Sequence, residues 1–156
     1  MEEIQVRIVT LEPLHVIAAH AYSASPEAEA WQKLVEWAKP KGLLDPAGAP
    51  RIFGFNNPDP SHGSPNYGYE FWLAVDPQVT GEGEFERKEF AGGLYGVTRC
   101  QGVENIGPTW QRLVAWRENS PYRVACHQWL EEHIGTLTAP QQPEDLILDL
   151  YIPIAK

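Results

Sequence analysis

Glu70 is the residue whose type and surroundings most clearly indicate chemistry in this sequence. It lies inside an aromatic, strand-like run, Tyr67-Gly68-Tyr69-Glu70-Phe71-Trp72-Leu73. Because side chains alternate between the two faces of a strand, Glu70 and Trp72 share one face, with Gly68 leaving room beside them. The face with Tyr69, Phe71 and Leu73 is the better core face. A carboxylate in an apolar wall costs several kcal/mol unless it is paired or hydrated.

Glu70 therefore has two functional interpretations and one structural interpretation. It could hold a cation by its charge, helped by a cation–π contact with Trp72 that contributes about 0.5–2 kcal/mol. It could instead activate a water molecule as a general base, which would make it a catalytic residue. The structural alternative is that this face of the strand is simply open to water.

A second acid stands at the matching place in the other half of the chain. Asp149 lies in the run Leu148-Asp149-Leu150-Tyr151, and Tyr151 shares its face. Its side chain is one methylene shorter than that of Glu70. The other candidate ligand-binding residues are aromatic, although a Trp at helical spacing is more often a core residue: Phe55, Tyr69, Tyr95, Trp31 and Trp110.

The elements that must position these residues occur twice. Trp31-Gln32-Lys33-Leu34-Val35-Glu36-Trp37 returns 79 residues later as Trp110-Gln111-Arg112-Leu113-Val114-Ala115-Trp116. The same offset places the strand 69–75 onto 148–154. A duplicated half-domain is expected to pack about a pseudo-two-fold axis, and the groove between the halves is a natural binding site.

Each half is predicted to run strand, helix, strand, strand, with its first strand divided at Pro13 or at Gly92-Gly93. Ser25-Pro26 predicts a helix start with the Ser25 hydroxyl as cap, and Pro40 ends that helix. Gly107-Pro108 opens the second helix, which ends before Pro121. The segment 124–134 is ambiguous between strand and helix. Short connections favour antiparallel pairing, so the fold class is α+β. The predicted strands are 5–11, 14–20, 51–55, 68–75, 85–90, 94–99 and 147–154.

The whole chain is expected to form a single domain, 1–156, with internal repeats at about 4–76 and 83–155. Its net charge of −9 repels phosphate backbones and anionic lipid, so direct binding to nucleic acid or membrane is not expected. The sequence shows neither a signal peptide nor a membrane span. Cys100 and Cys126 read as free thiols in the cytoplasm. The oligomeric state is left open.

Other chemical motifs are weak. The five His residues form no HExxH motif and no Cys/His ligand set, so neither a metal nor another cofactor is predicted. Gly92-Gly93-Leu94-Tyr95-Gly96 is not a phosphate-binding loop, because no Lys-Ser/Thr follows it. A GxSxG nucleophile elbow is lacking as well.

The doubled plan, the Trp-containing helix starts, the strand Tyr69-Glu70-Phe71-Trp72 and the closing Leu150-Tyr151-Ile152-Pro153-Ile154 resemble the GyrI-like small-molecule-binding superfamily. That superfamily includes effector-binding domains of AraC-type and MerR-type regulators and gyrase-inhibitory proteins. The resemblance implies a central channel for bulky, flat, often cationic compounds, with Glu70 as the pocket acid. It also implies that some stand-alone members hydrolyse cyclopropane-bearing compounds with such a Glu. Since the effector-binding plan uses the whole sequence, no helix-turn-helix domain is expected.

The leading hypothesis is a stand-alone protein that binds lipophilic, cationic or polyaromatic small molecules, with Glu70 as anchor. The first alternative is a hydrolase with Glu70 as base. The second is a protein-interaction module, which an exposed apolar patch outside the groove would favour.

Overall fold

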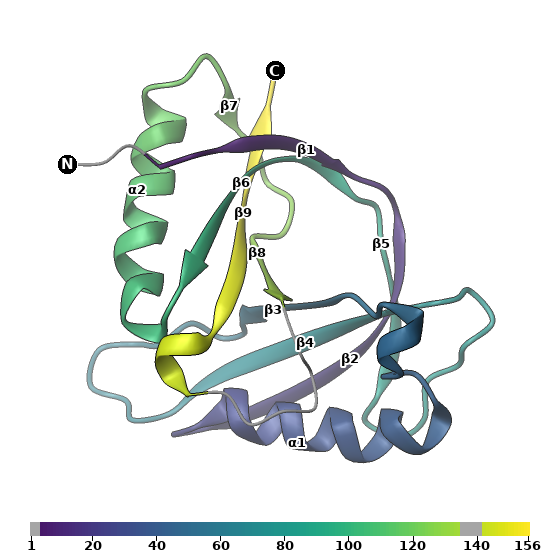
Figure 1. The fold of residues 1–156 in the computed structure, drawn as a ribbon. Coiled ribbons are helices and arrows are strands. Elements are labelled where there is room, and N and C mark those ends of the chain that lie inside the picture. Colours follow the sequence, from purple (N-terminus) through teal and green to yellow (C-terminus); the bar gives the residue numbers. More distant parts are fainter. Residues whose placement is uncertain (1–3, 135–141) are drawn as a thin grey trace. The chain divides into compact units, whose positions relative to one another are not determined.

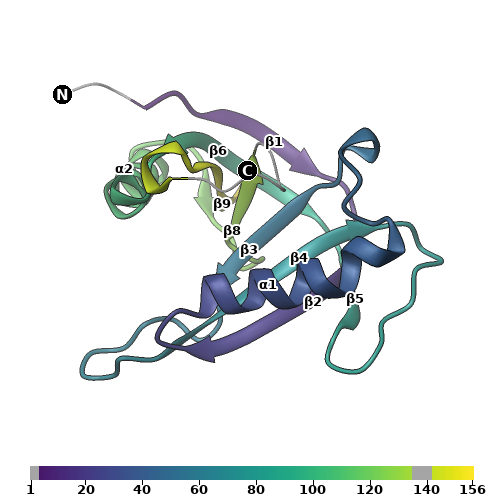
Figure 2. The ribbon, with the colours of Figure 1, turned by 60° about the horizontal axis from the view of Figure 1, so that its bottom comes forward.

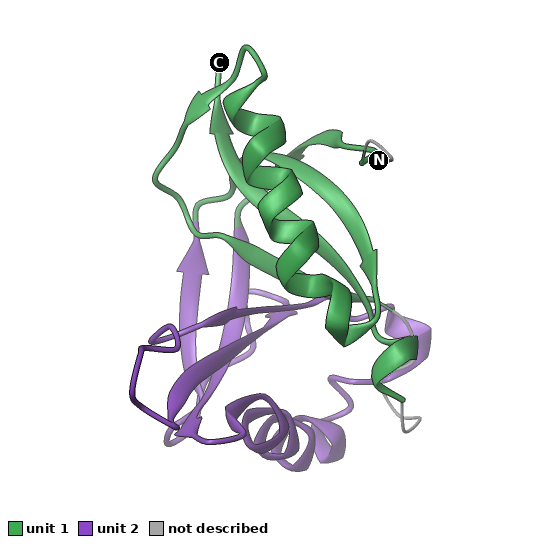
Figure 3. Ribbon diagram, turned by 90° about the vertical axis from the view of Figure 1, so that its left-hand side faces the viewer, with its two compact units in different colours: residues 1–13, 91–156 green, residues 14–90 purple. Residues whose placement is uncertain are grey.

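The computed structural model describes residues 4–134 and 142–156, so residues 1–3 and 135–141 of the predicted domain and repeats lie outside it. The chain divides into two compact units (Figure 3): unit 2 is residues 14–90, and unit 1 is residues 1–13 with 91–156. Each unit combines antiparallel strands with an α-helix, which confirms the predicted α+β class.

Unit 2 contains an antiparallel sheet in the order β3-β4-β2-β5 (Figure 1). Helix α1 (Pro26–Ala38) runs along one face of this sheet and packs on β2 and β4 (Figure 2). The opposite face is the one that carries Glu70, as described below. The strands are β2 (Leu14–Ser23), β3 (Ile52–Asn56), β4 (Tyr67–Val75) and β5 (Glu86–Phe90).

Helix α1 forms where the sequence predicts it, with Pro26 at its first position and Ala30, Leu34 and Ala38 buried at a spacing of four. The prediction that the Ser25 hydroxyl caps the helix is wrong. Ser25 has φ −139° and ψ 61°, and its side chain makes no capping hydrogen bond. Its own N–H instead donates to the hydroxyl of Ser23. Two 3-10 helices follow α1, η1 (Lys39–Lys41) and η2 (Pro46–Gly48).

Unit 1 contains an antiparallel sheet in the order β1-β6-β9-β8, and β7 also pairs with β9 (Figure 1). The segment 124–134, which the sequence left ambiguous between strand and helix, is strand at both ends. Its first residue ends β7, and its last five residues form β8. Helix α2 (Ile106–Glu118) follows the 3-10 helix η3 (Val103–Asn105), and η4 (Pro143–Asp145) precedes the last strand. The strands are β1 (Arg7–Leu11), β6 (Gly93–Gln101), β7 (Arg123–Val124), β8 (Leu130–Ile134) and β9 (Ile147–Ala155).

The core of unit 1 lies between α2 and one face of its sheet. Leu113 of α2 is buried together with the even-numbered apolar residues of β9 from Leu148 to Ile154. Trp110 and Trp116 pack at the edge of this cluster. The odd-numbered residues of β9, which include Asp149 and Tyr151, therefore occupy the face of the sheet away from α2.

The first strand of each predicted repeat lies in the unit formed by the other half of the chain. β1 precedes β2 in sequence, yet it pairs with β6 in unit 1; β5 precedes β6, yet it pairs with β2 in unit 2. Pro13 and Gly92-Gly93 stand between the strands that separate. Gly92 has φ +81°, and a Cβ there would overlap the Leu11 carbonyl oxygen, so glycine suits this crossing.

None of the helices in the described part of the chain has the length and apolar character that a bilayer-crossing helix needs.

Candidate functional site

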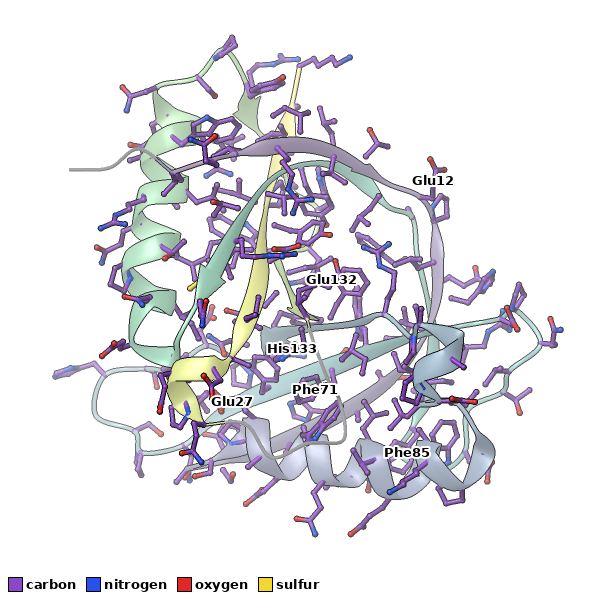
Figure 4. All side chains as sticks on the ribbon, viewed as in Figure 1. Glu12, Glu27, Phe71, Phe85, Glu132 and His133 are labelled. Atoms are coloured by element: carbon purple, nitrogen blue, oxygen red, sulfur yellow. The ribbon has the colours of Figure 1, made fainter. Side chains whose placement is uncertain are left out.

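The sheet of unit 2 places Glu70 and Trp72 together on the face away from α1. On the other face, Phe71 points to the helix, and its ring centroid lies 5.4 Å from that of Trp31 (Figure 4). The alternation read from the sequence of β4 therefore holds in the structure. The side chain of Glu70 is only 5% exposed. The Glu70 side chain is therefore shielded from water, and its role in ligand binding stays a prediction.

The Glu70 carboxylate is bound on both of its oxygens. The Trp72 indole N–H donates to Oε2 at 2.6 Å, and the Lys88 ammonium donates to the same oxygen at 2.9 Å. The Asn57 side-chain amide donates to Oε1 at 3.2 Å. Burial of this charge is therefore compensated by one cation and two neutral donors. Glu70 is therefore a paired carboxylate, which is one of the two ways in which its burial was expected to be tolerated.

Two further aromatic rings pack against Trp72, the residue that donates to Glu70. Phe55 meets the Trp72 ring edge-on with centroids 4.9 Å apart, and Phe90 of β5 lies 5.4 Å from Trp72. The register explains the grouping, because Phe55 is paired with Glu70 across β3 and β4. Ala18 of β2, opposite Trp72, contributes only a methyl group to this face. We call Glu70, Lys88, Trp72, Phe55 and Phe90 the Glu70 cluster.

Asn57 is held in place by the backbone where β3 ends. Its N–H donates to the Gly68 carbonyl at 2.8 Å, and the Gly68 N–H donates to the Pro58 carbonyl at 2.9 Å. His20, paired with Glu70 across β2 and β4, has its Nε2 2.6 Å from the Asn57 carbonyl oxygen. The end of β3 therefore fixes the amide that contacts Glu70.

Unit 1 carries a comparable arrangement at Asp149. Arg99 donates to both carboxylate oxygens, at 2.8 and 3.2 Å, and Arg7 donates to Oδ2 at 3.0 Å. The bond to Asp149 raises the pKa of Arg99, and the nearby negative charge adds to this effect. Asp149 is buried and held by two guanidinium groups, whereas Glu70 is held by one ammonium group.

Aromatic residues again lie beside the acid in unit 1. The rings of Tyr95 and Tyr151 meet edge-on at 5.3 Å, and the Tyr151 hydroxyl donates to Glu132 at 2.6 Å. Burial, and secondarily the charge of Tyr151, raises the pKa of Tyr95. The next residue on β8, His133, points to the other face (Figure 4), and burial lowers its pKa to about 4 against the opposing effect of Glu132.

The structure thus separates the predicted site residues by face. Phe55 and Trp72 gather at Glu70, and Tyr95 and Tyr151 lie on the face that carries Asp149. Trp31 and Tyr69 lie on the α1 side of β4, where Tyr69 packs 5.0 Å from Phe71. Trp110 of α2 donates to Glu131 at 3.0 Å and lies 5.4 Å from Trp129. Roles in ligand binding for all of these residues stay predictions.

Sequence reasoning missed Lys88, Phe90 and Asn57 in unit 2 and the two arginines in unit 1. Lys88 and Phe90 alternate on β5, so their common face was readable. Their contact with Glu70 depends on the pairing of β5 with β2, which the local sequence does not state. Within residues 4–134 and 142–156, no three His, Cys, Asp or Glu side chains are grouped as metal ligands would be.

Residues 7–154 match the model of a family described as integron-associated effector binding protein, Cass2. The fold is similar to that of the EcmrR C-terminal domain, with a TM-score of 0.72, 16% identity and 98% of both chains covered. In the complex of EcmrR with DNA, the TM-score is 0.72 at 15% identity over 97% of this chain. The chain spans 57% of the length of that protein.

Two further solved structures have the same fold. A hydrolase from Listeria innocua matches with a TM-score of 0.68 and 12% identity, covering 99% of this chain and 94% of that one. SAV2435 bound to tetraphenylphosphonium matches with a TM-score of 0.61 and 12% identity, covering 97% of this chain and 94% of that one. Identities this low show a shared fold alone. No curated protein sequence matches the chain.

Proposed function

This chain belongs to the integron-associated effector-binding protein family. We therefore propose that it binds bulky small molecules that are lipophilic and cationic or polyaromatic, and that it binds them at the Glu70 cluster. The predicted resemblance to the GyrI-like superfamily is confirmed. Membership of an effector-binding family indicates a small-molecule ligand. That the ligand lies in a groove between the halves, with Asp149 and Trp110 among its contacts, stays a prediction.

The observation that carries the proposal is that Glu70 is paired with a cationic group of the protein itself, the ammonium group of Lys88. The Lys88 ammonium lies 2.9 Å from Glu70 Oε2, the oxygen that also accepts the hydrogen bond from the Trp72 indole N–H. The site therefore has the charge and the hydrogen-bonding geometry to hold an ammonium-like or other cationic group. Trp72, Phe55 and Phe90 add apolar surface next to that charge, as the recognition of a lipophilic cation requires.

Tetraphenylphosphonium is a suitable probe, because it joins a delocalised positive charge to four phenyl rings and is the compound bound in the SAV2435 structure. We expect the parent chain to bind it in isothermal titration. Glu70→Gln keeps the size of the side chain and an acceptor for Trp72 but removes the charge. Loss of the Coulombic attraction between the carboxylate and the bound cation, roughly 1.5–3 kcal/mol, lowers the affinity about 10- to 100-fold.

The matched control is Glu89→Gln. Glu89 lies on β5 next to Lys88, but its side chain is 75% exposed and belongs to the other face of the strand. This variant makes the same change in net charge and is expected to bind like the parent. Equal affinities of the parent and Glu70→Gln, with both proteins folded, would remove Glu70 from the binding site.

The hydrolase alternative is supported less well by the geometry. A general base must accept a proton from water, and both oxygens of Glu70 already accept hydrogen bonds from Trp72, Lys88 and Asn57. A cyclopropane-bearing electrophile decides between the two functions. Turnover that falls roughly 10²–10⁴-fold in Glu70→Gln would establish the enzyme, and stoichiometric binding without product would exclude it for that substrate.

A further inference from the structure

Lys88 differs from the other partners of Glu70 in how it is held. The Glu70 side chain is 5% exposed, whereas that of Lys88 is 37% exposed, so the lysine is the member of this ion pair that reaches water. In the described part of the chain the Lys88 side chain makes no hydrogen bond except the one to Glu70. Its four-carbon stem is flexible, so the ammonium group can leave the carboxylate without breaking any other contact.

The strand that carries Lys88 lies at the edge of its sheet. β5 pairs with β2 over Leu14–Ala18, and Lys88 is opposite Val16. To reach Glu70 on β4, the lysine side chain must pass over β2, on the face where Ala18 contributes only a methyl group. The contact is therefore a long reach by a flexible side chain and not a consequence of direct cross-strand pairing.

Glu70, by contrast, has two further contacts that do not involve Lys88. The Trp72 indole at 2.6 Å and the Asn57 amide at 3.2 Å are neutral donors from residues that the sheet and the end of β3 hold in place. These two bonds keep the carboxylate oriented, but they do not neutralise its charge. Another cation must then take the place of the Lys88 ammonium, because an unpaired carboxylate among aromatic rings is strongly disfavoured.

We propose that Lys88 is a tethered internal cation that occupies the Glu70 anchor in the unliganded protein and determines the charge selectivity of the site. This inference rests on the proposed function. A cationic ligand replaces the Lys88 ammonium at Oε2, and the lysine turns into water, so charge balance at Glu70 is kept. A neutral molecule of the same shape cannot release Lys88, because the carboxylate would lose its only cationic partner among the described residues.

The first test compares tetraphenylphosphonium binding by the parent and by Lys88→Met, which keeps the length of the stem and removes the charge. Without the internal competitor we expect the cation to bind about 5- to 10-fold tighter. Triphenylphosphine oxide, a neutral compound with phenyl groups on phosphorus, is expected to gain no affinity. Lys41→Met is the control, because Lys41 pairs with the exposed Glu82 and its loss changes the net charge equally.

Unchanged or weaker cation binding by Lys88→Met would overturn the role of Lys88, provided that the parent binds the probe. An equal gain in Lys41→Met would also overturn it, because the effect would then be one of net charge. If the parent binds no tetraphenylphosphonium, or if Glu70→Gln binds it as well as the parent does, the proposed function fails instead.

A second measurement follows the unaltered chain in both the free and the bound state, and a variant is used only to assign the signal. The ¹⁵N-labelled ammonium group of Lys88, assigned by its absence in Lys88→Arg, should exchange slowly with water in the free protein. Saturation with tetraphenylphosphonium should make its exchange as fast as that of an exposed lysine. Retention of slow exchange in the bound state would show that Lys88 stays on Glu70 and would overturn the proposal.

Discussion

At the scale of the residue, Glu70 and Asp149 show how similar positions can differ in chemistry. Each is a buried acid on the helix-free face of its sheet, and each is paired with a basic residue from another strand of that sheet. Arg99 lies on β6, next to the strand of Asp149, whereas Lys88 lies on β5, two strands away from Glu70. Arg99 donates two hydrogen bonds to Asp149 and Arg7 donates a third, whereas a single lysine donates to Glu70. Because a forked guanidinium contact is harder to replace than a single ammonium contact, Glu70 is better suited than Asp149 to the proposed exchange of cations.

Tyr67 gives a prediction on pH dependence. Its hydroxyl donates to both Glu27 oxygens, at 2.6 and 2.8 Å, and burial together with this bond and charge raises its pKa from 10.0 to about 12. Since the folded state holds the proton more tightly than the unfolded state, this contribution to stability is complete below pH 10 and is lost between pH 10 and about 12. Tyr67→Phe should therefore be less stable than the parent at pH 8. Between pH 10 and about 12 it should lose less stability than the parent does.

Urea unfolding at several pH values measures this effect, and the ultraviolet absorbance of phenolate follows the titration directly. Tyr22→Phe is the control, because Tyr22 on β2 is 55% exposed. If parent and Tyr67→Phe show parallel losses of stability from pH 10 upwards, the bond to Glu27 does not control the titration of Tyr67.

The chemistry of the site could be predicted only in part from its residues. Period-two alternation was sufficient to place Glu70 and Trp72 on one face and Phe71 on the other, because both positions belong to one strand. Phe55 follows once β3 pairs with β4. Lys88 could not be assigned to Glu70, since a lysine in an edge strand ordinarily points into water. Its contact depends on a reach across β2 that no local pattern encodes.

At the scale of the element, the duplication predicted most of the fold. Apolar spacing and the Pro residues located α1 and α2, and the matched strands became β4 and β9. The pairing of β1 and β5 was not predictable in the same way. Pro13 and Gly92-Gly93 indicate that a strand is divided at these positions. They do not indicate with which sheet the first of the two resulting strands pairs.

The end of β3 offers a test of how an element positions the site. A Cβ on Gly68 would overlap the Asn57 carbonyl oxygen, which is backbone and cannot turn aside. We expect Gly68→Ala to destabilise the fold by about 1–3 kcal/mol, as overpacking does. Because Asn57 must then move, its amide leaves Glu70 and tetraphenylphosphonium binding weakens as well.

Gly48→Ala is the matched control in the same unit, because a Cβ there meets nothing within 4 Å. Its free energy of unfolding should lie within about 0.5 kcal/mol of the parent value. Urea unfolding and probe titration measure the two effects. A Gly68→Ala chain as stable as Gly48→Ala, with unchanged binding, would contradict the tight approach of β3 to β4.

At the scale of the whole molecule, two sources of attraction for a cation must be separated. The net charge of −9 draws any cation towards the protein, whereas Glu70 acts only on a molecule that reaches its cluster. The family membership of residues 7–154 argues for a defined ligand site, but a general field could produce weak binding by itself. The two contributions differ in how salt affects them, because exposed charges are screened more strongly than buried ones.

We therefore expect salt to weaken tetraphenylphosphonium binding without removing the effect of Glu70. Raising the ionic strength from about 0.01 M to about 1 M shortens the screening length from about 30 Å to about 3 Å. Affinities of the parent, Glu70→Gln and Glu89→Gln should fall together over this range, because all three share the long-range field. The ratio between parent and Glu70→Gln should keep most of its value, since Glu70 is buried and a bound cation would touch it directly. If that ratio approaches one at high salt, the contribution of Glu70 belongs to the general field of an acidic protein, and the anchor must be sought at another residue.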